Sequence, residues 1–100
     1  MQKSENKWTF LSNHSHVLLI LAQNPELTLR KVAHQIGITE RAIQGIVADL
    51  EEDGYLVKHR QGRQNHYQIY PGKHLRHPIE SHCTIGDLIQ MIHPGKKLTP

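Results

Sequence analysis

Residues 28–50, with the sequence TLRKVAHQIGITERAIQGIVADL, decide the fold. In the first part of this stretch, apolar residues follow Val32 one and four positions later, at Ala33 and Ile36. This spacing predicts the buried face of a short helix. Gly37 follows and ends the helix, because glycine adopts a left-handed backbone without steric cost. The stretch therefore begins with a short helix that stops at a tight turn.

A second helix is predicted from Glu40 to about Asp53. Thr28 and Thr39 stand where the first and second helices begin, and a threonine hydroxyl there accepts a hydrogen bond from a free backbone N–H. The second helix repeats apolar residues at the i, i+3, i+4, i+7 spacing of a buried face, namely Ile43, Ile46, Val47 and Leu50.

Together the two helices have the spacing of a helix-turn-helix. Ala33 is small where the helices are expected to cross closely, Ile38 fills the space between them, and Ile43 closes the corner from the other side. The alternative interpretation is an ordinary helical hairpin within a globular domain.

The outward side of the second helix, near its N-terminal end, is the surface that such a motif presents to the major groove of DNA. Arginine binds guanine through two hydrogen bonds and glutamine binds adenine in the same way, so Arg41 and Gln44 are the predicted base-reading residues. The DNA-binding residues predicted on this helix and its cap are Thr39, Glu40, Arg41, Gln44 and Gly45.

A β-hairpin is predicted after the second helix, with strands over 55–60 and 65–70. Because a two-stranded hairpin is marginal in water, its Leu56, Tyr67 and Ile69 side is expected to pack on the helices. Its cations are the remaining predicted DNA-binding residues, Lys58, Arg60 and Arg63. We expect them to reach phosphate or the minor groove as the wing of a winged helix, and the alternative is a charged edge that discourages aggregation.

Three runs resemble small winged helix-turn-helix transcriptional regulators of the MarR/ArsR type, found in bacteria and archaea: ITERAIQ at 38–44, IVADLEEDGYL at 46–56 and GRQNHY at 62–67. The likeness extends to WTFLSNH at 8–14, RHPIESH at 76–82 and IGDL at 85–88. It implies a cytoplasmic, sequence-specific DNA-binding protein that is commonly dimeric, without identifying the regulated genes. Gly45 departs from the pattern, because such proteins often carry a basic or polar residue there.

The predicted fold is mainly α with a small β-hairpin (α+β): a three-helix core, a wing and a C-terminal helix in a single domain over residues 1–100. Its core is expected over about 12–70, a C-terminal dimerisation or packing segment over about 79–93, and a loosely ordered tail over 94–100. The net charge of +3 is moderate, so the position of the cations carries more information than their number.

A further helix is predicted ahead of the helix-turn-helix, over about 12–23. Its residues 17–22 are apolar almost all round, so a second layer must cover them. A C-terminal helix is expected to do this, and Thr84 with Asp87 resembles a capping pair at its start. The predicted dimer interface consists of Leu18, Leu21, Ile85, Leu88, Ile89 and Ile92. Whether the apolar face of the C-terminal helix covers the helix over about 12–23 of its own chain or of a second chain stays open.

Nine histidines raise the question of a metal site, with His74, His77, His82 and Cys83 as candidates. Their spacing is irregular and the chain has one cysteine, so we predict no metal and no cofactor, and keep a metal-responsive repressor as an alternative. Serines and histidines over 12–16 have no carboxylate placed to orient a base, so we predict no enzyme.

The prediction for function is thus a sequence-specific DNA-binding transcriptional regulator, with double-stranded DNA as partner and a homodimer as the assembly, while the sequence does not identify an effector. The alternative is a winged-helix module that binds another protein. We expect the protein in the cytoplasm and without membrane association. The first seven residues are polar, the longest apolar run has six residues, and the chain has a single cysteine.

Overall fold

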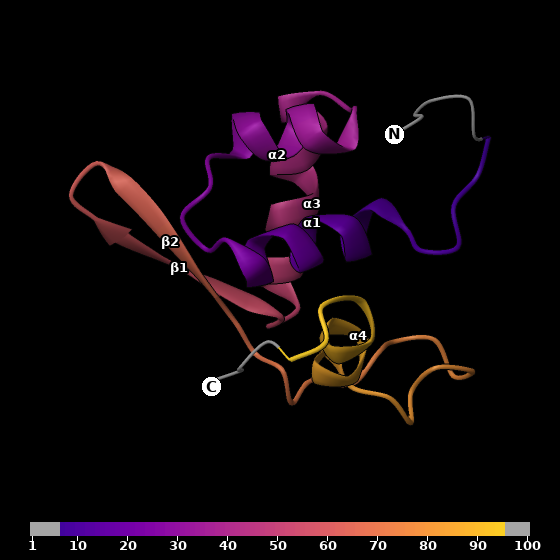
Figure 1. Ribbon diagram of the computed structural model, residues 1–100. Coiled ribbons are helices and arrows are strands. Elements are labelled where there is room, and N and C mark those ends of the chain that lie inside the picture. Colours follow the sequence, from indigo (N-terminus) through magenta and orange to yellow (C-terminus); the bar gives the residue numbers. More distant parts are fainter. Residues whose placement is uncertain (1–6, 96–100) are drawn as a thin grey trace.

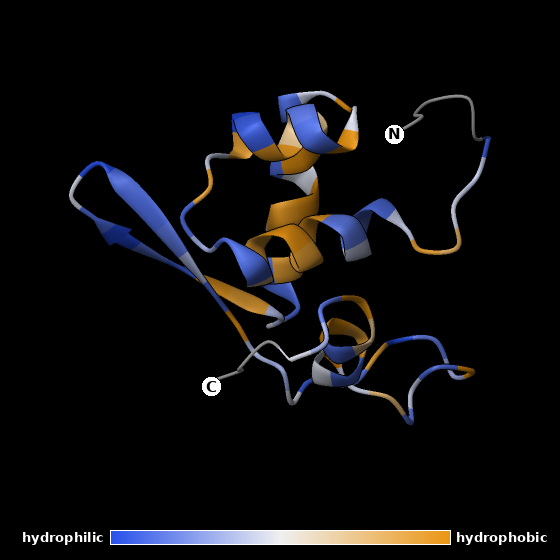
Figure 2. Ribbon diagram, viewed as in Figure 1, coloured by the Kyte–Doolittle hydropathy of each residue, from blue (hydrophilic) through white to orange (hydrophobic). Residues whose placement is uncertain are grey.

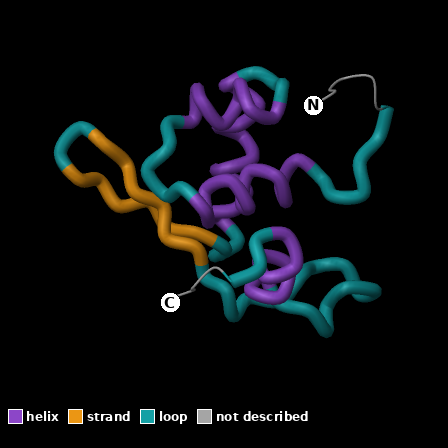
Figure 3. The backbone as a smooth tube through the Cα atoms, in the orientation of Figure 1, coloured by secondary structure: helices purple, strands orange, loops and turns teal. Residues whose placement is uncertain are grey.

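The structure is a computed structural model that describes residues 7–95. The elements follow one another as α1 (Asn13–Gln23), α2 (Leu29–Ile36), α3 (Glu40–Glu52), β1 (Leu56–Gln61), β2 (Gln64–Ile69) and α4 (Ile85–Ile92), as Figure 1 shows. This order confirms the predicted α+β fold, and Figure 3 shows the hairpin extending away from the helices. The predicted tail over 94–100 lies mostly outside the described residues.

The helix boundaries confirm the caps that the sequence predicted. The Thr28 and Thr39 hydroxyls accept hydrogen bonds from the backbone N–H groups of Lys31 (3.2 Å) and Ala42 (3.0 Å). Gly37 adopts a φ of +91° in the left-handed region and ends α2. Each cap satisfies a backbone group that the helix leaves without a partner, so the turn between α2 and α3 is set by the local sequence.

The hydrophobic core lies where α1 crosses α2 and α3, and Figure 2 shows the apolar faces of these helices turned toward one another. The apolar positions predicted for α3 are all buried. Val32 and Ala33 are buried in α2 as expected, whereas Ile36 is only partly buried because it lies at the end of the helix. Burial of these side chains supplies most of the stabilisation that α2 and α3 need, since short helices are marginal alone.

The wing is a regular antiparallel hairpin, with register from Leu56 opposite Ile69 to Gln61 opposite Gln64. Its base is anchored, because Leu56 and Tyr67 are buried and the Tyr67 backbone N–H donates to a carbonyl in the α1–α2 connection. Burial raises the pKa of the Tyr67 phenol above its ordinary value. The hairpin therefore gains the support from the helices that an isolated hairpin lacks.

The C-terminal segment returns to the helical body, and α4 packs on α1 of the same chain. Thr84 and Asp87 form the predicted capping box: the Thr84 hydroxyl accepts from the Asp87 backbone N–H, and the Asp87 carboxylate accepts from the Thr84 N–H. Backbone hydrogen bonds from Ile85 to Lys73 and from Gly86 to Pro71 tie the start of α4 to the loop before it.

This packing buries most of the predicted dimer stripe within one chain. Five of the six residues predicted for the dimer interface are buried within one chain: Leu18, Leu21, Ile85, Leu88 and Ile89. Ile92 is the exception, with 41% of its surface exposed. The apolar surplus of α1 is therefore covered by its own chain, and the stripe leaves little free surface for a second copy.

Candidate nucleic-acid interface

The N-terminal half of α3 carries the predicted base-reading surface. Because Ile43, Ile46 and Val47 are buried, the opposite side of the helix faces out. The DNA-binding residues predicted on this helix and its cap are all exposed: Thr39, Glu40, Arg41, Gln44 and Gly45. A continuous outward face thus begins at the N-terminus of α3.

Two features make this face accessible. Within residues 7–95, the side chains of Arg41 and Gln44 make no hydrogen bond or ion pair, so all their polar groups are available to a ligand. Next to them, Gly45 and Ala48 are exposed and small, and a Cβ built on Gly45 would meet no atom within 4 Å. The helix backbone can therefore approach a binding partner closely between the two longer side chains.

The wing contributes the second group of cations. Lys58, Arg60 and Arg63 are exposed, and residues 54–70 include no acidic residue. The Arg60 Nε donates to the Gly62 carbonyl oxygen at 3.0 Å, which leaves the rest of its guanidinium free at the hairpin tip. Figure 2 shows this arm as hydrophilic along most of its length, with apolar residues at its root. The hairpin therefore presents three exposed cations and has no acidic residue of its own.

The structure adds two cations that our sequence reasoning missed, Arg30 and Lys31 in the first turn of α2. Both are exposed and line a shallow surface depression that also includes His34, Gln35 and Glu40. This depression lies between the start of α2 and the start of α3, beside the predicted reading surface. The signal was available in the sequence, because the charged pair lies just after the cap Thr28.

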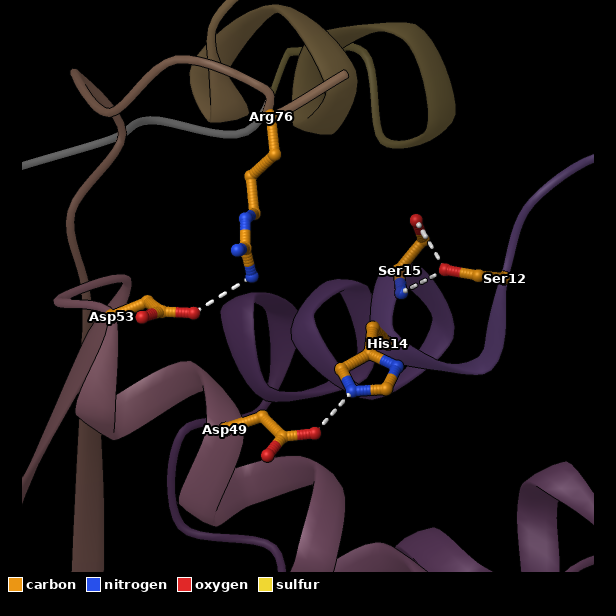
Figure 4. A network of polar contacts seen from close by, with 6 residues as sticks. All are labelled: Ser12, His14, Ser15, Asp49, Asp53 and Arg76. Atoms are coloured by element: carbon orange, nitrogen blue, oxygen red, sulfur yellow. Dashed lines mark hydrogen bonds and ion pairs between the residues drawn. The ribbon is translucent and has the colours of Figure 1, made fainter.

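The acidic end of α3 is tied into the body of the protein. Figure 4 shows His14 of α1 directed at Asp49, with 2.8 Å between Nε2 and Oδ2, and Arg76 directed at Asp53, with 2.7 Å between Nη1 and Oδ2. Each pair joins α3 to another segment of the chain. The Asp49 carboxylate beside His14 corrects the expectation that no carboxylate lies near residues 12–16, but among the described residues neither Ser12 nor Ser15 forms a hydrogen bond with His14. Two of the four carboxylates at this end of the helix thus have basic partners.

The histidine and cysteine candidates do not converge. The His74 Nδ1 donates to the Ser81 carbonyl oxygen at 2.8 Å, and the His77 Nδ1 accepts from the Ile79 N–H at 3.1 Å. In the described part of the chain, no three His, Cys, Asp or Glu side chains gather closely enough to hold a metal ion. His74, His77, His82 and Cys83 are therefore spread along a loop whose hydrogen bonds are structural.

Comparison with known proteins identifies this arrangement. Residues 12–57 match the model of a family described as winged helix-turn-helix DNA-binding. The fold is a winged helix-turn-helix. The match spans α1, α2, α3 and the first residues of β1, so it includes the predicted reading surface. Among curated proteins, none is similar enough in sequence to match.

A solved structure extends this result. The winged helix-turn-helix chain is similar to the PcaV transcriptional regulator from Streptomyces coelicolor, solved in complex with its natural ligand, with a TM-score of 0.52 and 28% sequence identity. The similarity covers 60% of this chain and 45% of the PcaV chain. Together the two comparisons confirm the predicted fold, a winged helix-turn-helix, and the match over residues 12–57 is to a DNA-binding family. Among residues 7–95, no helix is long and apolar enough to cross a membrane.

Proposed function

We propose that this protein binds specific double-stranded DNA sites through α3 and thereby regulates transcription. The observation that carries the proposal is the pair Arg41 and Gln44, exposed without partners among the described residues and next to the small residue Gly45. An arginine and a glutamine in the first turns of a helix suit guanine and adenine edges in the major groove. The missing side chain at Gly45 lets the helix sit deep in that groove.

In this proposal, the phosphate contacts come from two sides of α3. Lys58, Arg60 and Arg63 of the wing reach the backbone or the minor groove on one side. Arg30 and Lys31 at the start of α2 contact phosphate on the other. Contacts of this kind fix the position of the protein on DNA without reading sequence, so they complement the base contacts of α3.

The test is selection of bound duplexes from a random DNA pool, followed by measurement of affinity as salt is raised. We expect an enriched sequence motif. We also expect the logarithm of affinity to fall linearly with the logarithm of salt concentration, with a slope of about −0.9 for each phosphate contact. No enrichment together with salt-insensitive capture of a protein partner would contradict the proposal and favour the winged-helix protein-interaction module.

We further propose a homodimer that uses the exposed end of α4 rather than the five buried residues of the predicted interface. Apolar side chains remain exposed at the end of α4, where Met91 and Ile92 expose 64% and 41% of their surface. A second copy would double the contacts that a small reading head makes with DNA, and would require an inverted-repeat site. Sedimentation of Met91→Glu with Ile92→Glu is expected to show monomers at concentrations where the natural chain is dimeric. A natural chain that already sediments as a monomer would contradict the dimer.

The proposal assigns no catalytic step, no cofactor and no membrane contact to the chain. A regulator that acts on chromosomal DNA works in the cytoplasm, which is the location predicted from the sequence. PcaV is named as a transcriptional regulator, and because this chain spans less than half of PcaV, regulation of transcription by this protein is our inference.

A further inference from the structure

A cavity of about 300 Å³ opens between α1, the C-terminal half of α3, the loop over 70–84 and α4. Its floor is apolar and is formed by Leu18, Leu50, Leu75, Ile85 and Leu88. Cavities of this size with apolar floors accommodate small organic molecules in proteins. The cavity lies at the opposite end of α3 from Arg41, so the DNA-facing surface makes no use of it.

The rim of the cavity is acidic. Asp49, Asp53 and Glu80 supply three carboxylates, and Arg76 supplies one guanidinium, so the lining has a formal net charge of −2 when His14 is neutral. Arg76 is engaged by Asp53 and His14 by Asp49, as Figure 4 shows. Within residues 7–95 the Glu80 carboxylate has no hydrogen bond or ion pair. One carboxylate at the rim therefore has no cationic partner.

We propose that this cavity binds a small organic cation, with its apolar body on the leucine-rich floor and its ammonium group at Glu80. The floor excludes a wholly polar ligand, because its burial would leave polar groups without partners. An anion would have to approach Arg76, which Asp53 already pairs through Nη1, against the repulsion of three carboxylates. A neutral ligand would gain at most a hydrogen bond from Glu80 and no attraction between opposite charges. The combination of an apolar floor and an acidic rim complements an amine attached to a hydrocarbon body.

The test is an NMR titration of the full 100-residue chain with three probes of one shape: benzylamine, benzyl alcohol and benzoate. We expect benzylamine to shift the backbone amides of the cavity lining and to bind roughly three- to five-fold more tightly than benzyl alcohol, as one partly exposed charge pair allows. Benzoate binding as tightly as benzylamine, or shifts confined to other surfaces, would overturn the proposal. The titration contains no DNA, so its result is independent of the proposed regulation.

Two variants sharpen the test. Glu80→Gln is expected to remove the roughly three- to five-fold advantage of benzylamine and leave benzyl alcohol binding unchanged. Ser15→Leu places a larger side chain at the lining and is expected to abolish binding of both probes. The matched control is Glu26→Gln, which removes a carboxylate that pairs with His66 outside the cavity and is expected to change neither probe.

Equal effects of Glu80→Gln and Glu26→Gln would show that only overall charge attracts the amine, and would overturn the site. Within residues 7–95 the Glu80 side chain makes no hydrogen bond or ion pair that Glu80→Gln would break, so this comparison decides the question even where Ser15→Leu disturbs α1.

Discussion

The two ends of α3 differ in what surrounds their polar side chains. At the N-terminal end, Arg41 and Gln44 have no partners among the described residues, and Gly45 beside them leaves the backbone bare. At the C-terminal end, Asp49 and Asp53 are each held by a basic side chain from another segment. We call the N-terminal end, where these side chains have no partner within residues 7–95, the free end of α3, and the C-terminal end, where the carboxylates are paired, its anchored end. A helix of 13 residues is long enough to keep the two apart.

The largest expected effect comes from removing the base-reading side chains of the free end. Arg41→Ala and Gln44→Ala are each expected to reduce discrimination between a selected and a scrambled duplex by about 1–3 kcal/mol, the value of a bidentate base contact. Competition binding with the two duplexes measures this. Discrimination that stays unchanged in both variants would show that the free end does not read bases.

A smaller and different effect is expected from the wing. Arg60→Ala together with Arg63→Ala should weaken binding to all sequences almost equally, because phosphate contacts carry no sequence information. The slope of log affinity against log salt should fall by about 0.9 for each phosphate that no longer has an arginine beside it. Salt titration of the double variant measures the slope, and an unaltered slope would place the hairpin away from DNA.

Gly45→Ala tests whether the bare backbone serves binding or only weakens the helix. The variant is expected to raise the free energy of unfolding by about 1 kcal/mol, because alanine favours a helix more than glycine and the new Cβ meets no protein atom. DNA affinity is expected to fall, since the methyl group enters the space between helix and groove. Thermal unfolding measures the stability of the variant, and DNA binding of the same sample measures its affinity. A rise in both the free energy of unfolding and the DNA affinity would refute close approach at this position.

The anchored end is expected to give the smallest effect. Asp49→Asn should cost at most about 1 kcal/mol of unfolding free energy, because the Asp49 and His14 side chains are both about half exposed or more. Glu26→Gln is the matched control, since it breaks the other histidine–carboxylate pair, with 3.2 Å between His66 Nδ1 and Glu26 Oε2. Neither change should alter base discrimination. A loss of discrimination in Asp49→Asn alone would show that the two ends of α3 are coupled.

The sequence predicted the local features of the fold well. Periodicity placed Ile43 and Val47 in the core, and Gly37 marked the turn, because each of these signals depends on residues within one or two helical turns. The capping box at Thr84 was visible for the same reason. A one-residue difference remains at the end of α3, which was predicted to reach about Asp53 and ends at Glu52, with Asp53 as its C-cap.

Contacts between segments that are distant in the chain could not be predicted from the sequence. The stripe of Leu88 and Ile89 predicted a helix with a buried face, and its period is the same whether α1 of the same chain or of a partner covers it. The cavity is lined by residues from four segments, so no local sequence pattern predicts it. Arg30 and Lys31 show a different limit: their position after a cap is plain in the sequence, but their proximity to α3 depends on the angle at which the helices cross.

The attachment of the wing has a consequence for how its length can change. β2 is held to the α1–α2 connection at its middle, where the Tyr67 N–H donates to the Pro25 carbonyl oxygen at 2.9 Å and His66 pairs with Glu26. These contacts fix the direction of the hairpin, and the residues beyond them, 60–64, are exposed and leave room for growth. Each residue pair inserted at the turn would therefore add about 3.4 Å of reach along the same line. The arm can lengthen or shorten to meet a different stretch of DNA backbone while the helix that reads bases stays as it is.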